Sequence, residues 1–175
     1  MNDMLALIGP LIPALRRYAR ALTRDGAVAD DLVQDCLERA IAGWHQRRHD
    51  GDARSWVFTI LHNLAVNAGR RKTRRGFHHE LGDVDEELLS RHGDQEDRLR
   101  LRDLARALDT LPEEQRAVLL LVSVEDLSYA EAARVLDIPL GTVMSRLARA
   151  REKVLNFMEG DAVVVSAAPG LRRVK

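Results

Sequence analysis

Apolar residues recur at intervals of three and four along most of this chain, and that spacing constrains the fold more than any other feature. Leu11, Leu15, Tyr18 and Leu22 would share one face of a helix, and a similar ladder follows between residues 56 and 64. Only 4% of the residues are aromatic, so the cores must be built mainly from Leu, Ala and Val. Gly and Pro are sparse, and no run of alternating β-branched residues recurs. The sequence therefore predicts an all-α protein.

Two helical sections are separated by a segment rich in Gly, His and acidic residues. We expect a first domain over residues 4–75, an acidic linker over 76–97, a second domain over 98–159 and a flexible tail over 160–175. Helices are predicted over about 28–44 and from about 53 past 70 in the first domain. In the second domain four helices are predicted. One covers 99–108, one begins at Pro112, a short one ends near residue 136, and the last covers 141–157. The expected fold is thus two small helical domains joined by a flexible linker.

The helix predicted over 28–44 has a recognisable buried side. Leu32, Leu37, Ala40, Ile41 and Trp44 are its expected core residues. Residues 23–26 (TRDG) are expected to end the preceding helix, and the polar residues 45–52 are expected to form a loop.

The second domain carries a short helix, a tight turn and a longer helix, which is the helix-turn-helix plan. Ser128 and Glu131 have the spacing of a capping box that begins the short helix, and residues 137–139 (DIP) break it. In the last helix Val143, Leu147, Ala150 and Val154 are assigned to the core.

A second set of side chains in the last helix is assigned to the face away from the core. It comprises Thr142, Ser145, Arg146 and Arg149, with Arg151 and Lys153 expected nearer the phosphates. Arg can bind guanine through two hydrogen bonds in the major groove, and Ser or Thr can reach bases or phosphates. A solvated face of an ordinary amphipathic helix is the alternative. The coincidence of capping box, turn and core pattern favours DNA binding.

The net charge is zero, with 27 basic and 27 acidic residues, but the charge is segregated along the chain. Residues 1–75 hold 13 Lys and Arg against 8 Asp and Glu, whereas residues 76–103 hold 4 against 9. Local fields govern binding to a polyanion, so the neutral total does not exclude DNA as a partner.

Several classes of protein are disfavoured. The single cysteine, Cys36, excludes an internal disulfide and a cysteine-based zinc site, and we expect it in the core. The histidine pairs at 45 and 49 and at 78 and 79 lack accompanying ligands and are expected on the surface. A single cysteine suits a reducing cytoplasm, where we expect the chain. No apolar run is long enough to span a membrane, so no membrane insertion is expected. No phosphate-binding glycine loop or catalytic triad order occurs, so we expect neither enzymatic activity nor a cofactor.

Taken together, five short stretches resemble the extracytoplasmic-function sigma factors of bacterial RNA polymerase. In the second domain these are residues 111–116 (LPEEQR), 127–133 (LSYAEAA) and 140–151 (LGTVMSRLARAR). In the first domain they are residues 30–35 (DDLVQD) and 54–63 (RSWVFTILHN). The resemblance covers about residues 8–158. A helix-turn-helix alone is shared with many regulators, whereas the two N-terminal motifs in this order are more specific.

The resemblance implies a set of partners and contact residues. Core RNA polymerase would be bound through its β′ clamp helices and its β flap, with Asp30, Asp31, Leu32, Gln34 and Asp35 as the clamp-binding residues. Asn63 and Asn67 would contact the −10 promoter element. A base of that element would be flipped into a pocket that these residues form with loop 45–52. Arg70, Arg71 and Lys72 would bind the backbone phosphates. Thr142, Ser145, Arg146, Arg149 and Lys153 would contact the −35 element. The family also implies a stress response and control by an anti-sigma factor.

The sequence departs from the family in two places. Met144 stands where many relatives have a basic residue, and Asn67 stands where an Asp is common. Both departures bear on the promoter sequence preferred, not on the class of protein.

Two other functions fit some of these features. A helix-turn-helix regulator could bind operator DNA as a dimer, with the first section as a sensor. An adaptor, such as an anti-sigma antagonist that imitates a sigma domain, would not bind DNA.

The acidic linker also has two interpretations. It is either plain solubilising disorder, which is our default, or a mimic of nucleic acid in a polymerase channel. The acids concerned are Asp83, Asp85, Glu86, Glu87, Asp94, Glu96 and Asp97.

Overall fold

The computed structural model describes residues 2–46, 52–74 and 95–166. Within these stretches every residue lies in a helix or in a short connection, and none lies in a strand, which confirms the all-α prediction. Most of the acidic linker lies outside the described residues. Among those described, no helix is long and apolar enough to cross a membrane.

The described residues of the first unit form four α-helices. They are α1 (Asn2–Ile8), α2 (Ile12–Thr23), α3 (Gly26–Gly43) and α4 (Ala53–Arg74), with 3-10 turns at Gly9–Leu11 and Trp44–Gln46. The break expected at residues 23–26 is only two residues long. Arg24 takes a left-handed conformation (φ 58°) after α2, and the Asp25 side chain caps α3 by accepting from the Val28 amide at 3.1 Å. Gly26 therefore begins α3 instead of ending α2.

The core of the first unit follows the predicted ladders. Leu15, Tyr18 and Leu22 are buried, and the Tyr18 ring meets Phe58 of α4 edge to face at 5.6 Å between centroids. One prediction was wrong: Ile41 is 53% exposed. It follows the fully buried Ala40 by one residue, and one residue along a helix turns the side chain about 100° away from the core.

The rest of the buried side predicted for α3 is confirmed to different degrees. Leu32 and Ala40 are buried, whereas Leu37 and Trp44 are half-buried and pack against the core. Trp44 meets Trp56 at 6.1 Å, so Trp56 also packs within the unit.

The second unit contains α6 (Gln95–Asp109), α7 (Glu113–Ser123), α8 (Tyr129–Leu136) and α9 (Leu140–Ser166). The capping box is confirmed: Ser128 Oγ accepts from the Glu131 amide at 3.2 Å, and the Glu131 carboxylate accepts from the Ser128 amide at 2.7 Å. Asp137 ends α8 in a left-handed conformation (φ 51°). The short helix, tight turn and long helix form the predicted helix-turn-helix.

The last helix was predicted correctly on its inner side but not in its length. Val143, Leu147 and Ala150 are buried and Val154 is half-buried, as expected. However, α9 continues to Ser166 and passes through Gly160, where the tail was predicted to begin. A single helical glycine costs only about 1 kcal/mol relative to alanine, so it does not by itself end a helix.

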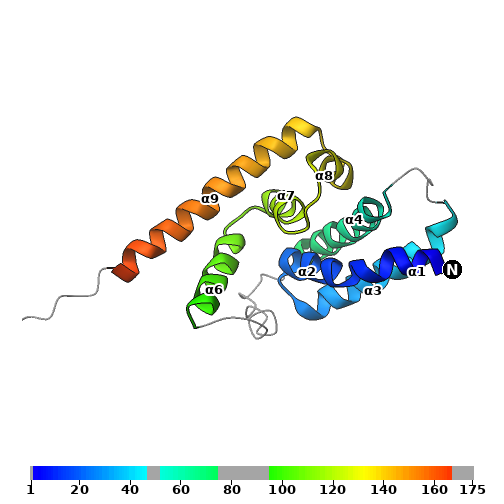
Figure 1. Cartoon of the computed structure of the whole chain (residues 1–175), viewed down its shortest axis with the longest axis horizontal. Helices are drawn as coiled ribbons and strands as arrows, with labels where there is room; N and C mark the ends of the chain where they lie inside the picture. The colour runs from blue at the N-terminus through cyan, green and yellow to red at the C-terminus, as the bar shows by residue number, and fades with distance from the viewer. Residues whose placement is uncertain (1, 47–51, 75–94, 167–175) are drawn as a thin grey trace, which may run out of the picture.

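The two units pack against each other, and the sequence did not predict how they would be placed. Figure 1 shows α7 and α8 lying beside α2 and α4, while α6 and the far half of α9 extend away from the first unit. Buried apolar residues of both units form one continuous cluster. The packing brings α4 and the helix-turn-helix to the two sides of one cleft.

Candidate polymerase and nucleic-acid interfaces

Acidic and amide side chains form an exposed row along α3. Asp31, Gln34 and Asp35 are exposed at spacings of three and one, so they share one face of the helix. The Gln34 amide donates to the Glu38 carboxylate at 3.1 Å, which extends the row by one turn. We call Asp31, Gln34 and Asp35 the α3 acidic face. It could accept hydrogen bonds and ion pairs from a basic partner surface.

The two other residues predicted for this surface are placed differently. The Asp30 carboxylate lies 3.6 Å from Arg16 Nε and 3.4 Å from a terminal nitrogen of Arg20, so two arginines of α2 partly neutralise it. Leu32 is only 7% exposed and packs in the core. Leu32 therefore packs α3 against the core, on the side away from the acidic face, and is not available to a partner.

On α4, three of the predicted −10 contacts form one row. Asn63, Asn67 and Arg70 are exposed at spacings of four and three and line the cleft between the units. We call these three residues the α4 face. Arg71 is exposed beside it, whereas the side chain of Lys72 lies outside the described residues.

Hydrogen bonds hold α4 in place at two points, at His62 next to Asn63 and at the start of the helix. The Tyr18 hydroxyl and His62 Nδ1 lie 2.9 Å apart, and burial lowers the pKa of His62 to about 4. A neutral His62 thus sits directly before Asn63.

At the start of the helix, Asp52 Oδ2 accepts from the amide and hydroxyl of Ser55 at 3.0 and 2.8 Å. Burial pushes the pKa of Asp52 up, but these hydrogen bonds outweigh it and hold the pKa below its usual value. Residues 47–51, most of the predicted base pocket, lie outside the described stretches.

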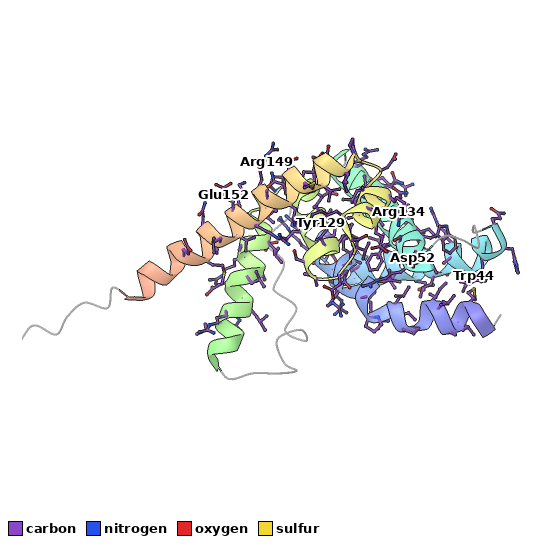
Figure 2. The ribbon with its side chains drawn as sticks, turned by 45° about the horizontal axis from the view of Figure 1, so that its top comes forward. Trp44, Asp52, Tyr129, Arg134, Arg149 and Glu152 are labelled. Carbon is purple, nitrogen blue, oxygen red and sulfur yellow. The ribbon has the colours of Figure 1, made fainter. Side chains whose placement is uncertain are left out.

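The exposed face of α9 is rotated slightly from the predicted one. Ser145, Arg149 and Lys153 are exposed as expected, whereas Thr142 and Arg146 are half-buried, and Arg146 lines the cleft toward the first unit. Figure 2 shows Arg149 and Glu152 along the outer length of α9.

Two further residues, Met144 and Ala148, are exposed on α9; the sequence analysis named Met144 only as a departure from the family and did not name Ala148. They lie to one side of the buried row of Val143, Leu147 and Ala150, and the core pattern itself could have identified them as exposed.

A cleft lies between the α4 face and the second unit. It has a volume of about 940 Å³. The α4 side contributes His62, Asn63, Asn67 and Arg70, and the opposite side contributes Glu113, Glu114, Asp137 and Arg146. Arg146 is not free within it, because its guanidinium pairs with the Glu114 carboxylate at 2.5 Å. Among the described residues predicted for the −35 element, Arg146 is the one that lines the cleft with the predicted −10 residues.

Comparison with known families matches both units. The family described as "Sigma2 domain of PhyR" matches residues 8–62, and the family described as "Sigma-70, region 4" matches residues 101–154. The first match covers α2, α3 and the first part of α4, and the second covers the helix-turn-helix.

Relatives of known class cover most of the chain. The extracytoplasmic-function RNA polymerase sigma factor EcfG of Rhodopseudomonas palustris is 37% identical over 160 residues, which are 91% of this chain and 85% of that protein. The corresponding factor SigM of Mycobacterium tuberculosis is 34% identical over 82% of this chain and 71% of its own length.

The fold agrees with that of solved sigma factors. The sigma factor RpoE of Bartonella quintana, solved in complex with the anti-sigma factor NepR, superposes with a TM-score of 0.80 at 29% identity, over 91% of this chain and 98% of that one. Both family matches occur in the expected order, the relatives of one class cover most of the chain, and the fold is shared. The chain therefore belongs to the extracytoplasmic-function sigma factors of RNA polymerase.

Proposed function

We propose that this chain is an alternative sigma factor that binds core RNA polymerase and directs it to a particular set of promoters. The observation that supports this most directly is the separation of three exposed surfaces on one chain: the α3 acidic face, the α4 face and the outer face of α9. A sigma factor needs one surface for the enzyme and two for promoter elements. The chain itself would catalyse nothing, since the polymerase performs the chemistry, and it would act in the cytoplasm.

The α3 acidic face is the proposed docking surface for the β′ clamp helices. Asp31 and Asp35 are exposed carboxylates one turn apart, and Gln34 between them adds a hydrogen-bonding amide. Charges arranged in this way raise the association rate and fix the register of a complex with a basic partner. The second unit would meet the β flap.

The α4 face is proposed to bind the opened −10 element. The amides of Asn63 and Asn67 each offer a donor and an acceptor to the edge of an unpaired base. Arg70 and Arg71, one turn further along, are placed to hold backbone phosphates, which makes binding sensitive to salt.

The outer face of α9 is proposed to enter the major groove at the −35 element. Ser145 and Arg149 are the exposed polar residues of the predicted set in the first half of the helix, and Lys153 follows toward the phosphates. Met144 adds an apolar contact that suits a thymine methyl group. Thr142 and Arg146 stand at the edge of this face, so Arg146 would have to leave Glu114 to reach DNA.

Control by an anti-sigma factor is part of the proposal. RpoE was solved in complex with the anti-sigma factor NepR, and this chain shares its fold along nearly its whole length. We propose that an anti-sigma factor binds this chain in the same way and releases it under stress.

A second candidate function is suggested by the match to the sigma2 domain of PhyR. PhyR of Bartonella quintana is described as an anti-anti-sigma factor and was solved in complex with NepR. A chain of that kind would capture an anti-sigma factor without starting transcription. Exposed Ser145 and Arg149 in the second helix of a helix-turn-helix favour the sigma-factor function instead.

Binding to purified core polymerase tests the proposed docking surface. The wild-type chain should co-elute with core enzyme, and the double variant Asp31→Ala/Asp35→Ala should lose most of that association. Glu159→Ala is a matched control, because it removes an exposed carboxylate near the far end of α9. An α3 variant that associates as well as Glu159→Ala would contradict the assignment of the α3 acidic face.

A further inference from the structure

Two apolar side chains stand exposed in the first half of α9. Met144 is 52% exposed, and Ala148, one turn further along, is exposed as well. Side chains four residues apart share one face of a helix, so the two form a row. We call Met144 and Ala148 the α9 apolar pair. Such a pair contributes binding energy only when a partner covers it.

A polar row runs directly beside the α9 apolar pair. Ser145 Oγ donates to the backbone oxygen of Thr142 at 3.1 Å. Because its proton is used within the helix, the Ser145 hydroxyl offers only lone pairs to a partner and acts as an acceptor. Arg149, one turn further, is exposed along the outer length of α9 (Figure 2).

The basic residue between these positions points elsewhere. The Arg146 guanidinium lies 2.5 Å from the Glu114 carboxylate of α7, and Arg146 lines the cleft toward the first unit. Arg149 is therefore the first exposed charged residue of α9. The turns before it present an apolar side chain and a hydrogen-bond acceptor side by side, at Met144 and Ser145.

The major-groove edge of one kind of base pair matches this combination. An A·T pair presents the thymine C5-methyl group, which is apolar, and the adenine N6 amino group, which is a donor. A G·C pair presents the cytosine amino group but no methyl group. An apolar side chain next to an acceptor therefore fits an A·T pair better than a G·C pair.

We propose that Met144 and Ser145 together read an A·T pair in the −35 element. Met144 covers the thymine methyl group, and Ser145 accepts a hydrogen bond from the adenine amino group. Ala148 extends the apolar contact, and Arg149 binds guanine beyond it. This inference rests on the proposed function, because it takes the outer face of α9 as the surface that enters the major groove.

Selection of bound DNA tests which base pair is read. Holoenzyme assembled from core RNA polymerase and the full chain is bound to a pool of duplexes of randomised sequence, and the bound duplexes are sequenced. The upstream element recovered with the wild-type chain should contain a fixed A·T pair. Met144→Arg should change the preference at that pair toward G·C and leave the other positions as they were, because arginine seeks the acceptors of guanine. A role of Met144 in folding alone would not move the preference at one pair.

Removal of the methyl group from DNA tests the contact of Met144. Deoxyuridine differs from thymidine only in lacking that group. Placed at the selected pair, it should weaken binding of the wild-type holoenzyme about fourfold, since a buried carbon of this size contributes about 0.8 kcal/mol and 1.4 kcal/mol is a factor of about ten. Met144→Ala holoenzyme should lose most of that difference.

Removal of the adenine amino group tests the contact of Ser145 in the same way. Deoxynebularine carries a hydrogen atom in place of that group. It should weaken binding of the wild-type holoenzyme, and Ser145→Ala should bind the two duplexes with similar affinity.

Leu155→Ala is the matched control. Leu155 is 57% exposed and lies seven residues after Ala148, on the same side of α9. It lies about 16 Å along the helix from Met144, which exceeds the width of the major groove, about 12 Å. Leu155→Ala should keep both the selected element and the full effect of deoxyuridine.

Four outcomes overturn the inference. The selected element has no A·T pair, or wild-type holoenzyme binds the deoxyuridine duplex as tightly as the thymidine duplex. Met144→Ala stays as sensitive to deoxyuridine as wild type, which removes Met144 from the contact. Met144→Ala weakens association with core polymerase and leaves promoter selection intact, which assigns the α9 apolar pair to a protein partner. Failure of the proposed function is distinct, because then no shared element is recovered and wild-type chain with core polymerase starts no transcription.

Discussion

The contact between Tyr18 and His62 predicts that the chain loses stability as the pH falls below neutral. Burial, with a contribution from the Glu113 carboxylate, raises the pKa of the Tyr18 hydroxyl, so this group stays protonated and donates to His62 Nδ1 at 2.9 Å. The neutral imidazole then carries its proton on Nε2. Adding a proton to Nδ1 would remove the acceptor of a buried hydroxyl.

The sign and size of the effect follow from the pKa of His62 in the two states. Burial lowers it to about 4 from the ordinary 6.5. Between these values the unfolded chain binds a proton and the folded chain does not, so the free energy of unfolding falls as the pH is lowered from 6.5 toward 4. The loss is about 2 kcal/mol between about pH 7.5 and about pH 5, and it levels off at about 3 kcal/mol below about pH 4.

The assay compares wild type with His62→Gln by urea denaturation at about pH 7.5 and about pH 5. Glutamine does not titrate, but its amide oxygen can still accept the Tyr18 hydroxyl. All other titrating groups are common to the two proteins, and the Asp52 carboxyl, whose pKa is lowered, loses its contribution only at more acidic pH. Wild type should lose about 2 kcal/mol more than the variant. Equal losses in the two proteins would refute the assignment of a buried, neutral His62.

Three substitutions in the second unit test its packing and its outer face. Ser128→Ala should lower the free energy of unfolding by about 1 kcal/mol in chemical denaturation, because the Glu131 amide loses its side-chain acceptor; an unchanged stability would mean that the capping box does not form in solution. Leu147→Ala removes a side chain that is 2% exposed and should cost about 2–5 kcal/mol in the same assay; a cost typical of a surface site would contradict its place in the core. Arg149→Ala should change stability by less than about 0.5 kcal/mol, because the side chain is exposed. In footprinting of the polymerase complex it should weaken protection of the −35 element, and full protection would argue against α9 as the helix that contacts it.

The local elements could be predicted from the sequence because each depends on residues close together in the chain. The capping box needs only Ser128 and Glu131, three residues apart. The buried side of α9 follows from the spacing of Val143, Leu147 and Ala150. Ile41 shows the limit of this approach, since an apolar residue at the edge of a helical stripe can be buried or exposed depending on what packs there.

The arrangement of the two units could not be predicted, for a physical reason. It depends on charged pairs between residues far apart in sequence, such as Arg17 with Glu125 and Arg24 with Asp109. Isolated in the sequence, these residues resemble any other surface charges. Within the second unit, Arg146 of α9 pairs with Glu114 of α7, so that a residue assigned to the DNA-facing side by spacing alone is engaged within the protein.

Transcription by purified core polymerase, combined with this chain over a library of random promoter sequences, tests the central claim most directly. Sequencing of the RNA 5′ ends should reveal starts downstream of a shared two-part motif, absent with core enzyme alone. Asn63→Ala/Asn67→Ala should reduce initiation through the downstream half of that motif, and Arg149→Ala through the upstream half. RNA no more abundant than with core enzyme alone, although the chain binds the polymerase, would contradict a sigma factor and favour a chain that only captures an anti-sigma factor.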